Sequence, residues 1–160
     1  EAAKGVRKAV LCQRMDDILG SVINQIRITQ FEMRAHDLIA SGARAEELDK
    51  LWSDLLKEDF PELDYPDKSV NWSAIPHIFQ SPFYSYSWAL GILLVLALYK
   101  RYEEEGEAFV PKMKALLAAV GSKPPAELLE ELGYDITTEQ FWEDGFKVIR
   151  AFVDELSTLV

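Results

Sequence analysis

The last apolar residues of the chain repeat at a spacing that is typical of a helix. They follow one another at intervals of four, three, four, three and four residues: Trp142, Phe146, Ile149, Val153, Leu156 and Val160. This period places all of them on one face of an α-helix. Thr137 and Gln140 precede the stripe and match a capping box in which Thr137 is the N-cap. The spacing predicts a final helix with one buried face.

The same kind of spacing recurs through the rest of the chain. A first helix is predicted from near the start to about Ala40, on Leu11, Met15, Ile18, Val22 and Ile26. A second is predicted to end at Pro61, on Leu48, Leu51, Trp52, Leu55 and Leu56. No segment shows the alternation of a strand. The predicted fold class is therefore all-α, with about six helices in an orthogonal or bundle arrangement, as part of a larger helical fold.

A proline-rich segment separates the second helix from the third. Residues 61–80 show no sustained periodicity and are predicted to form an ordered loop, with Trp72 and Phe79 as its anchors in the core. Ser81 and Pro82 then resemble the N-cap and first residue of a helix.

That third helix is predicted to run to about Glu105, before Gly106. Because residues 89–98 are apolar on all sides, it should be the central helix, covered on most sides. A fourth helix is predicted around residues 109–120, and a short fifth helix after Pro124.

Charge and apolar content exclude several classes of function. The chain has 17 basic and 27 acidic residues, a formal charge of −10, so we expect no nucleic-acid partner. Its longest apolar stretch, from Trp88 to Tyr99, is too short to cross a bilayer, which needs about 20 residues. Cys12 is the single cysteine, so no internal disulfide can form, and a cytoplasmic setting is expected. With 160 residues, we expect one domain over residues 1–160.

Candidate reactive side chains gather where the proline-rich segment meets the third helix. His77, Tyr84 and Tyr86 fall within ten residues of one another. A phenol hydroxyl can donate a hydrogen bond to a developing oxyanion, and a helix N-terminus adds positive potential there. The alternative is that these rings simply pack into a core. Chemistry alone leaves both interpretations open.

The order of short motifs around these residues resembles one enzyme family. Trp72, Ile75-Pro76-His77-Ile78-Phe79, Pro82-Phe83-Tyr84-x-Tyr86 and Ala89-Leu90-Gly91 resemble the segment that follows the zinc site in oligoendopeptidase F and related thimet-oligopeptidase-type zinc metallopeptidases. Downstream, Gly133-Tyr134-Asp135-Ile136 and Phe141-Trp142-x-x-Gly145-Phe146 continue the resemblance. Upstream, Gln25 and Phe31-Glu32 do the same.

The resemblance implies a helical endopeptidase that hydrolyses short peptides. In this family, zinc is held by the two His of an H-E-x-x-H helix and a later Glu. This chain contains only His36 and His77 and no such motif, so the zinc ligands are expected N-terminal to residue 1, in a missing part of the same protein. The resemblance further implies that Tyr86 contacts the oxyanion, that His77 contacts the oxyanion or the substrate backbone, and that Tyr84 binds substrate. The chain alone is expected to bind no zinc and to be inactive.

Several alternatives stay open at this point. The chain could be a non-catalytic helical interaction module on the same scaffold, and in isolation its wall-facing apolar residues could cause self-association. Glu32 is either a buried partner of the missing catalytic half or a surface residue. A solvent-side ion pair of Glu32 with His36 is favoured over a metal pair. Cys12 lies on the stripe of the first helix and is expected to pack there rather than to act as a nucleophile.

Overall fold

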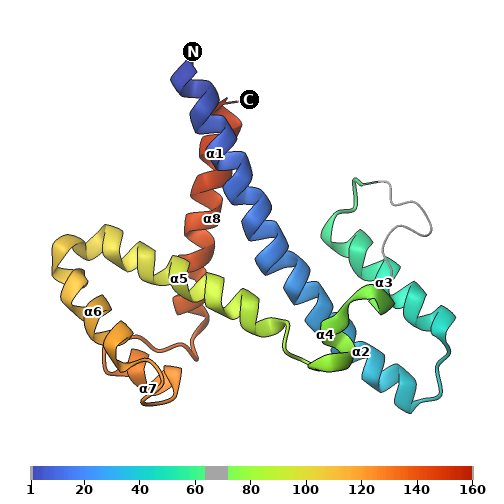
Figure 1. The fold of residues 1–160 in the computed structure, drawn as a ribbon. Coiled ribbons are helices and arrows are strands. Elements are labelled where there is room, and N and C mark those ends of the chain that lie inside the picture. The colour runs from blue at the N-terminus through green and yellow to red at the C-terminus, as the bar shows by residue number, and fades with distance from the viewer. Residues whose placement is uncertain (1, 64–71, 160) are drawn as a thin grey trace. The chain divides into compact units, whose positions relative to one another are not determined.

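The described residues form a chain of helices (Figure 1). A computed structural model describes residues 2–63 and 72–159. Apart from an isolated β-bridge between Val120 and Lys123, these residues form no strand, and the predicted all-α fold class is confirmed. Residues 64–71 of the predicted loop and Val160 of the predicted stripe lie outside the described residues. The α-helices are α1 (Ala2–Ile18), α2 (Asn24–Ala40), α3 (Ala45–Asp59), α4 (Pro76–Gln80), α5 (Tyr86–Glu105), α6 (Val110–Ala119), α7 (Pro125–Glu130) and α8 (Glu139–Leu159).

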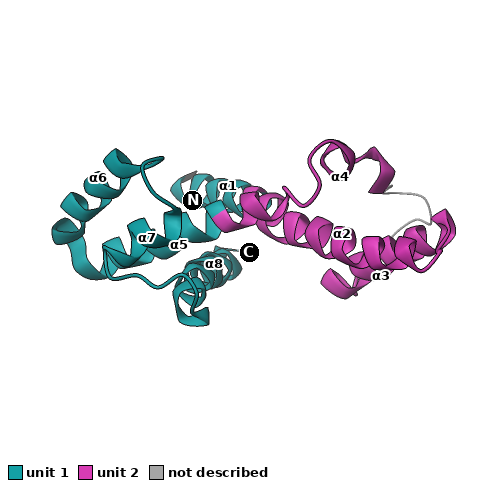
Figure 2. Ribbon diagram, turned by 90° about the horizontal axis from the view of Figure 1, so that it is seen from below, with its two compact units in different colours: residues 1–16, 91–160 teal, residues 17–90 magenta. Residues whose placement is uncertain are grey.

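Contacts divide the chain into two compact units (Figure 2). Unit 1 comprises residues 1–16 and 91–160, and unit 2 comprises residues 17–90. In the described part of the chain, no helix combines the length and the apolar composition that spanning a bilayer requires.

The core of unit 2 forms where α2 packs against α3 (Figure 1). Phe31 meets Trp52 edge to face, with ring centroids 5.2 Å apart, and also contacts Trp72 at 5.4 Å. Trp72 therefore anchors the proline-rich segment as predicted, and its indole donates a hydrogen bond to Asp49. The buried residues of this core are Ile28, Phe31, Ala35, Leu48, Trp52, Leu55 and Leu56.

The predicted first helix contains a local change of winding. A π-helical turn, Leu19–Ile23, separates α1 from α2. The predicted spacing of three or four residues did not indicate this turn, in which hydrogen bonds join residues five positions apart. Val22 in this turn is fully buried.

In unit 1, α8 approaches α5 closely along one stripe. The residues of α8 that are buried are Phe141, Asp144, Gly145 and Val148. A Cβ atom at Gly145 would lie 2.9 Å from the backbone oxygen of Leu93 on α5, so only a glycine allows this approach. The buried residues of the unit's core are Ala97, Leu98, Phe109, Leu129, Tyr134 and Phe141.

The start of α8 differs from the predicted capping box. The helix begins at Glu139, and the hydroxyl of Thr137 donates to Asp135 at 2.6 Å. Asp135 also accepts the backbone amide of Thr137 at 2.8 Å, which forms a local turn. The prediction of Thr137 as the N-cap was wrong because a competing acceptor lies two residues upstream.

The expectation that α5 is covered on most sides is also wrong for the described chain. Ala97 and Leu98 are buried, but Val95 is 61% exposed and Tyr99 is 45% exposed. An apolar composition on all sides shows that a helix can be covered, but it does not supply the covering elements. One face of α5 therefore meets solvent in this chain.

A buried acid makes the stability of unit 1 depend on pH. The carboxylate of Asp144 pairs with Arg101 and Lys147, each at 2.7 Å. Burial opposes its ionisation, but the hydrogen bond from Lys147 and the charge of Arg101 outweigh burial and lower the pKa of Asp144. A carboxyl with a lowered pKa stabilises the fold above its unfolded pKa of about 3.9, and this contribution is lost as the pH falls through the folded value.

We therefore expect the melting temperature to fall on acidification below about pH 4, and Asp144→Asn to lower it at pH 7 while weakening its dependence on pH. Circular dichroism melts between pH 7 and pH 3 measure both effects. Asp154→Asn is the matched control, since Asp154 is an exposed aspartate of the same helix. An equal pH dependence in the Asp144→Asn chain would contradict this account.

Candidate functional site

The segment that precedes α5 is more helical than predicted. Residues Trp72–Ala74 form a 3-10 turn (η2) and Pro76–Gln80 form α4, where the loop prediction was wrong. Pro76 occupies the first turn, where its missing amide has no helical partner to lose. The side chain of Phe79 is 60% exposed, so its predicted role as an anchor was also wrong. Ile75 and Ile78 pack against the core instead.

A tight turn, and not a helix start, follows α4. The amide of Tyr84 donates to the carbonyl of Ser81 at 3.1 Å, and Pro82 and Phe83 are the two central residues of this turn. Phe83 has a φ angle of 60°, which interrupts any helix. Helix α5 therefore begins at Tyr86, later than the predicted start at Ser81 and Pro82.

Two of the three predicted site residues lie side by side. His77 lies on α4, Tyr84 directly follows the turn, and Tyr86 is the first residue of α5. The rings of His77 and Tyr84 are stacked, with centroids 6.2 Å apart and planes 9° apart. In residues 72–88, no hydrogen bond or ring contact joins Tyr86 to either ring. All three side chains are exposed in this chain, Tyr86 by 54%.

The exposed aromatic residues around the turn form what we call the aromatic surface. Its members are each 40–60% exposed: Phe79, Phe83, Tyr84, Tyr86 and Trp88. Large apolar side chains that gather in solvent usually mark a binding surface. Phenol hydroxyls and the N-terminus of α5, a helix of 20 residues, both favour developing negative charge. The arrangement can therefore bind an extended ligand and donate to an anion.

Glu32 on α2 contacts the backbone of the turn that carries this surface. The residue is 1% exposed, and its carboxylate accepts a hydrogen bond from the amide of Phe83 at 2.8 Å. The ring of His36, one helical turn further along α2, contacts the ring of Phe83 with centroids 4.9 Å apart. The alternative that Glu32 is a surface residue is wrong, because its carboxylate is buried against the turn. The predicted solvent-side ion pair with His36 is wrong for the same reason. The link joins residues 51 positions apart, so no local pattern could indicate it.

The described side chains do not fit a metal ion. Within residues 2–63 and 72–159, no group of three or more His, Cys, Asp or Glu side chains is placed to hold one. Cys12 is half-buried on α1. What the candidate site offers is therefore the hydrogen-bond donors of His77, Tyr84 and Tyr86 and the exposed aromatic surface.

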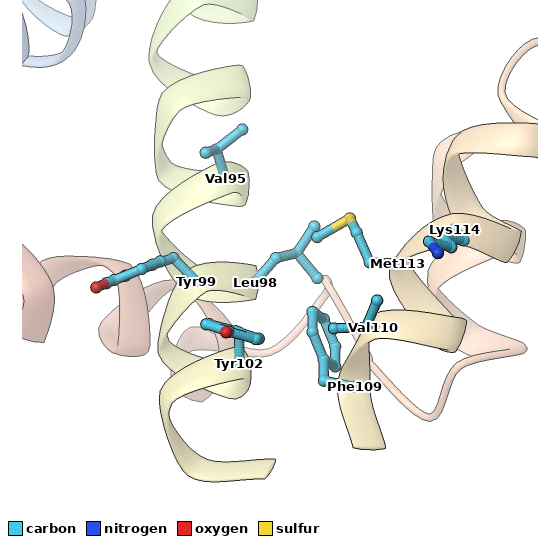
Figure 3. A pocket seen from close by; sticks show the side chains of 8 residues that line it. All are labelled: Val95, Leu98, Tyr99, Tyr102, Phe109, Val110, Met113 and Lys114. Atoms are coloured by element: carbon cyan, nitrogen blue, oxygen red, sulfur yellow. The ribbon is translucent and has the colours of Figure 1, made fainter. Parts of the chain in front are cut away.

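A separate apolar pocket lies in unit 1 between α5 and α6 (Figure 3). It encloses about 400 Å³, and Leu98 and Met113 point toward each other across it. Its lining has no carboxylate and no imidazole, and its polar groups are the phenols of Tyr99 and Tyr102 and the amine of Lys114. The residues that line it are Val95, Leu98, Tyr99, Tyr102, Phe109, Val110, Met113 and Lys114.

Comparisons with known proteins agree on one family of enzymes. The family model described as Peptidase family M3 matches residues 7–148. An oligoendopeptidase F homolog of Borreliella burgdorferi is 29% identical over 156 residues, which are 95% of this chain and 26% of that protein. Oligopeptidase PepF of Bacillus subtilis is 28% identical over 158 residues, which are 96% of this chain and 23% of that protein.

A solved structure has the same fold. The crystal structure of oligoendopeptidase-F from Enterococcus faecium superposes with a TM-score of 0.86 and 26% identity, over 98% of this chain and 30% of that one. The chain thus spans about a quarter of the length of the curated relatives it matches.

Proposed function

Because the chain belongs to peptidase family M3, we propose that it is the C-terminal part of a zinc-dependent oligoendopeptidase and contributes one wall of the site that cleaves short peptides. The observation that carries this proposal is the exposure of His77, Tyr84 and Tyr86, which lie on α4, after the turn and at the start of α5. These groups belong to a segment inside the family match, residues 7–148. An exposed set of donors is what a substrate contact requires.

Each of the three residues has a distinct role in this proposal. Tyr86 donates a hydrogen bond to the oxyanion that forms when the scissile carbonyl is attacked. His77 contacts that oxyanion or the substrate backbone. Tyr84, whose ring stacks on His77, binds the substrate and limits where the imidazole can lie. The positive end of α5 favours the same negative charge.

The zinc ligands would be supplied by other residues of the full-length protein. Three or four ligands are needed, and the described residues of this chain offer no such group. We place the ligands N-terminal to residue 1, in an H-E-x-x-H helix and a following Glu. The Lewis acidity of the metal would polarise the scissile carbonyl. This chain alone is then expected to be inactive and to bind no stoichiometric zinc.

The upstream coding sequence, the full-length product and the isolated chain each test the proposal. The coding sequence upstream of Glu1 should encode H-E-x-x-H followed by a further Glu, and the full-length product should cleave short peptides in a zinc-dependent way. The 160-residue chain by itself should give a zinc content near zero and no cleavage. An open reading frame that starts near residue 1, or a full-length product without peptidase activity, would instead favour a non-catalytic interaction module. Stoichiometric zinc on the isolated chain would contradict the placement of the ligands.

A further inference from the structure

Glu32 is a buried carboxylate whose position packing does not explain. Its side chain is 1% exposed on α2, and one oxygen accepts the amide of Phe83 at 2.8 Å. The other oxygen is buried and has no hydrogen-bond partner among the residues that the structure describes. Removing a carboxylate from water is costly unless hydrogen bonds compensate for the lost hydration. An apolar side chain would fill this place at a lower cost, so the carboxylate points to a specific task.

The turn that Glu32 holds is strained. Pro82 in its second position and the φ angle of 60° at Phe83 in its third are the features of a type II turn. The third position normally carries glycine, because the left-handed region crowds the Cβ of any other residue against the backbone. Phe83 adopts it, and the amide of this same residue donates to Glu32. Glu32 thus fixes the one residue of the turn whose backbone is strained, from a helix that is distant in the sequence.

The turn determines where the tyrosines lie. Tyr84 closes it by donating its amide to Ser81, and the carbonyl of Tyr84 accepts both the amide and the hydroxyl of Ser87, at 3.0 and 2.7 Å. Tyr86 lies between these contacts, as the first residue of α5. Helix α2 holds the same turn twice, through Glu32 on the Phe83 amide and through His36 on the Phe83 ring. Moving the Phe83 amide would therefore move the start of α5 and the hydroxyl of Tyr86.

We propose that Glu32 is a positioning residue for peptide hydrolysis, which holds the turn at Phe83 so that the Tyr86 hydroxyl meets the oxyanion. This inference rests on the proposed function, in which Tyr86 is the donor. Glu32 itself touches neither the substrate nor the reacting atoms. It acts through the backbone of residues 81–86.

The full-length peptidase carrying Glu32→Ala tests this role. We expect kcat for a short peptide to fall by about 10- to 100-fold with KM changed less than about twofold, because a misplacement of about 1 Å can cost about 100-fold. Glu32→Gln keeps an acceptor of the same volume and should lose less, about two- to tenfold. Asp37→Asn is the matched control on the exposed face of α2 and should leave kcat unchanged. If Glu32→Ala does not fold, Glu32→Gln carries the test.

A double-mutant cycle separates positioning from a general structural effect. In the Tyr86→Phe background, either Glu32 variant should lower kcat by less than about twofold more, because the hydroxyl that Glu32 places is already gone. Losses that multiply would show that Glu32 acts independently of Tyr86 and would overturn the inference. Unchanged kcat in both Glu32 variants would overturn it as well. An active Tyr86→Phe enzyme would instead refute the role of Tyr86 in the proposed function.

Discussion

Replacing Tyr86 with phenylalanine in the full-length peptidase is expected to lower kcat for a short peptide by about 100- to 1,000-fold, with little change in KM. The substitution removes one hydroxyl from the first residue of α5 and keeps the ring. A donor to the oxyanion stabilises the transition state more than the bound substrate, so its loss appears in kcat. Steady-state hydrolysis of a fluorogenic short peptide measures both constants.

Two further tyrosines serve as comparisons for this prediction. Tyr99→Phe removes the same hydroxyl from another exposed tyrosine of α5 and should leave turnover unchanged. Tyr84→Phe keeps the ring that stacks on His77 and should act mainly on KM, as expected for a substrate contact. Normal turnover by the Tyr86→Phe enzyme would mean that Tyr86 is not the oxyanion donor, whatever the other variants do.

Helix positions followed from the spacing of apolar residues, but helix ends did not always follow. The stripe on Leu48, Trp52 and Leu55 correctly predicted α3. The start of α5 was predicted too early because Ser81 and Pro82 are residues that begin helices as well as turns. Only the left-handed backbone at Phe83 decides between the two, and a phenylalanine does not signal it. The strain became visible only in three dimensions.

The contact face of α8 shows a second limit of pattern reading. The predicted stripe, which includes Trp142, Phe146 and Ile149, is only half-buried. The closest approach to α5 runs through Asp144 and Gly145, residues that a hydrophobic pattern does not count. A glycine allows contact by having no side chain, and a paired aspartate can be buried. The burial of Asp144 and the close contact at Gly145 both depend on α5, which a pattern within α8 cannot indicate.

The sequence likewise indicated only part of the candidate site. His77, Tyr84 and Tyr86 could be proposed from the sequence because they are reactive side chains close together in the chain. The support from Glu32 could not, because burial and a hydrogen bond across 51 residues are tertiary properties. The positioning residue is thus found from the turn that it holds, and not from a motif.

The same substitution at two helical glycines is expected to have opposite effects on stability. Gly145→Ala should lower the free energy of unfolding by about 1–2 kcal/mol, although alanine is the better helix former by about 1 kcal/mol. The added Cβ would lie 2.9 Å from the backbone oxygen of Leu93 and 3.5 Å from the backbone nitrogen of Ala97. Backbone atoms cannot rotate away, so α5 and α8 must separate, and overpacking of this kind costs about 1–3 kcal/mol.

Gly91→Ala is the matched control, within α5 itself. A Cβ at Gly91 meets nothing within 4 Å, so only the gain in helix propensity remains, and we expect stabilisation by up to about 1 kcal/mol. Urea unfolding followed by circular dichroism gives both free energies, and unchanged slopes would show that the unfolded states are comparable. If both variants were stabilised equally, α8 could not approach α5 as closely as Gly145 allows. Opposite signs would assign the difference to the contact between the two helices, since the residue change is identical.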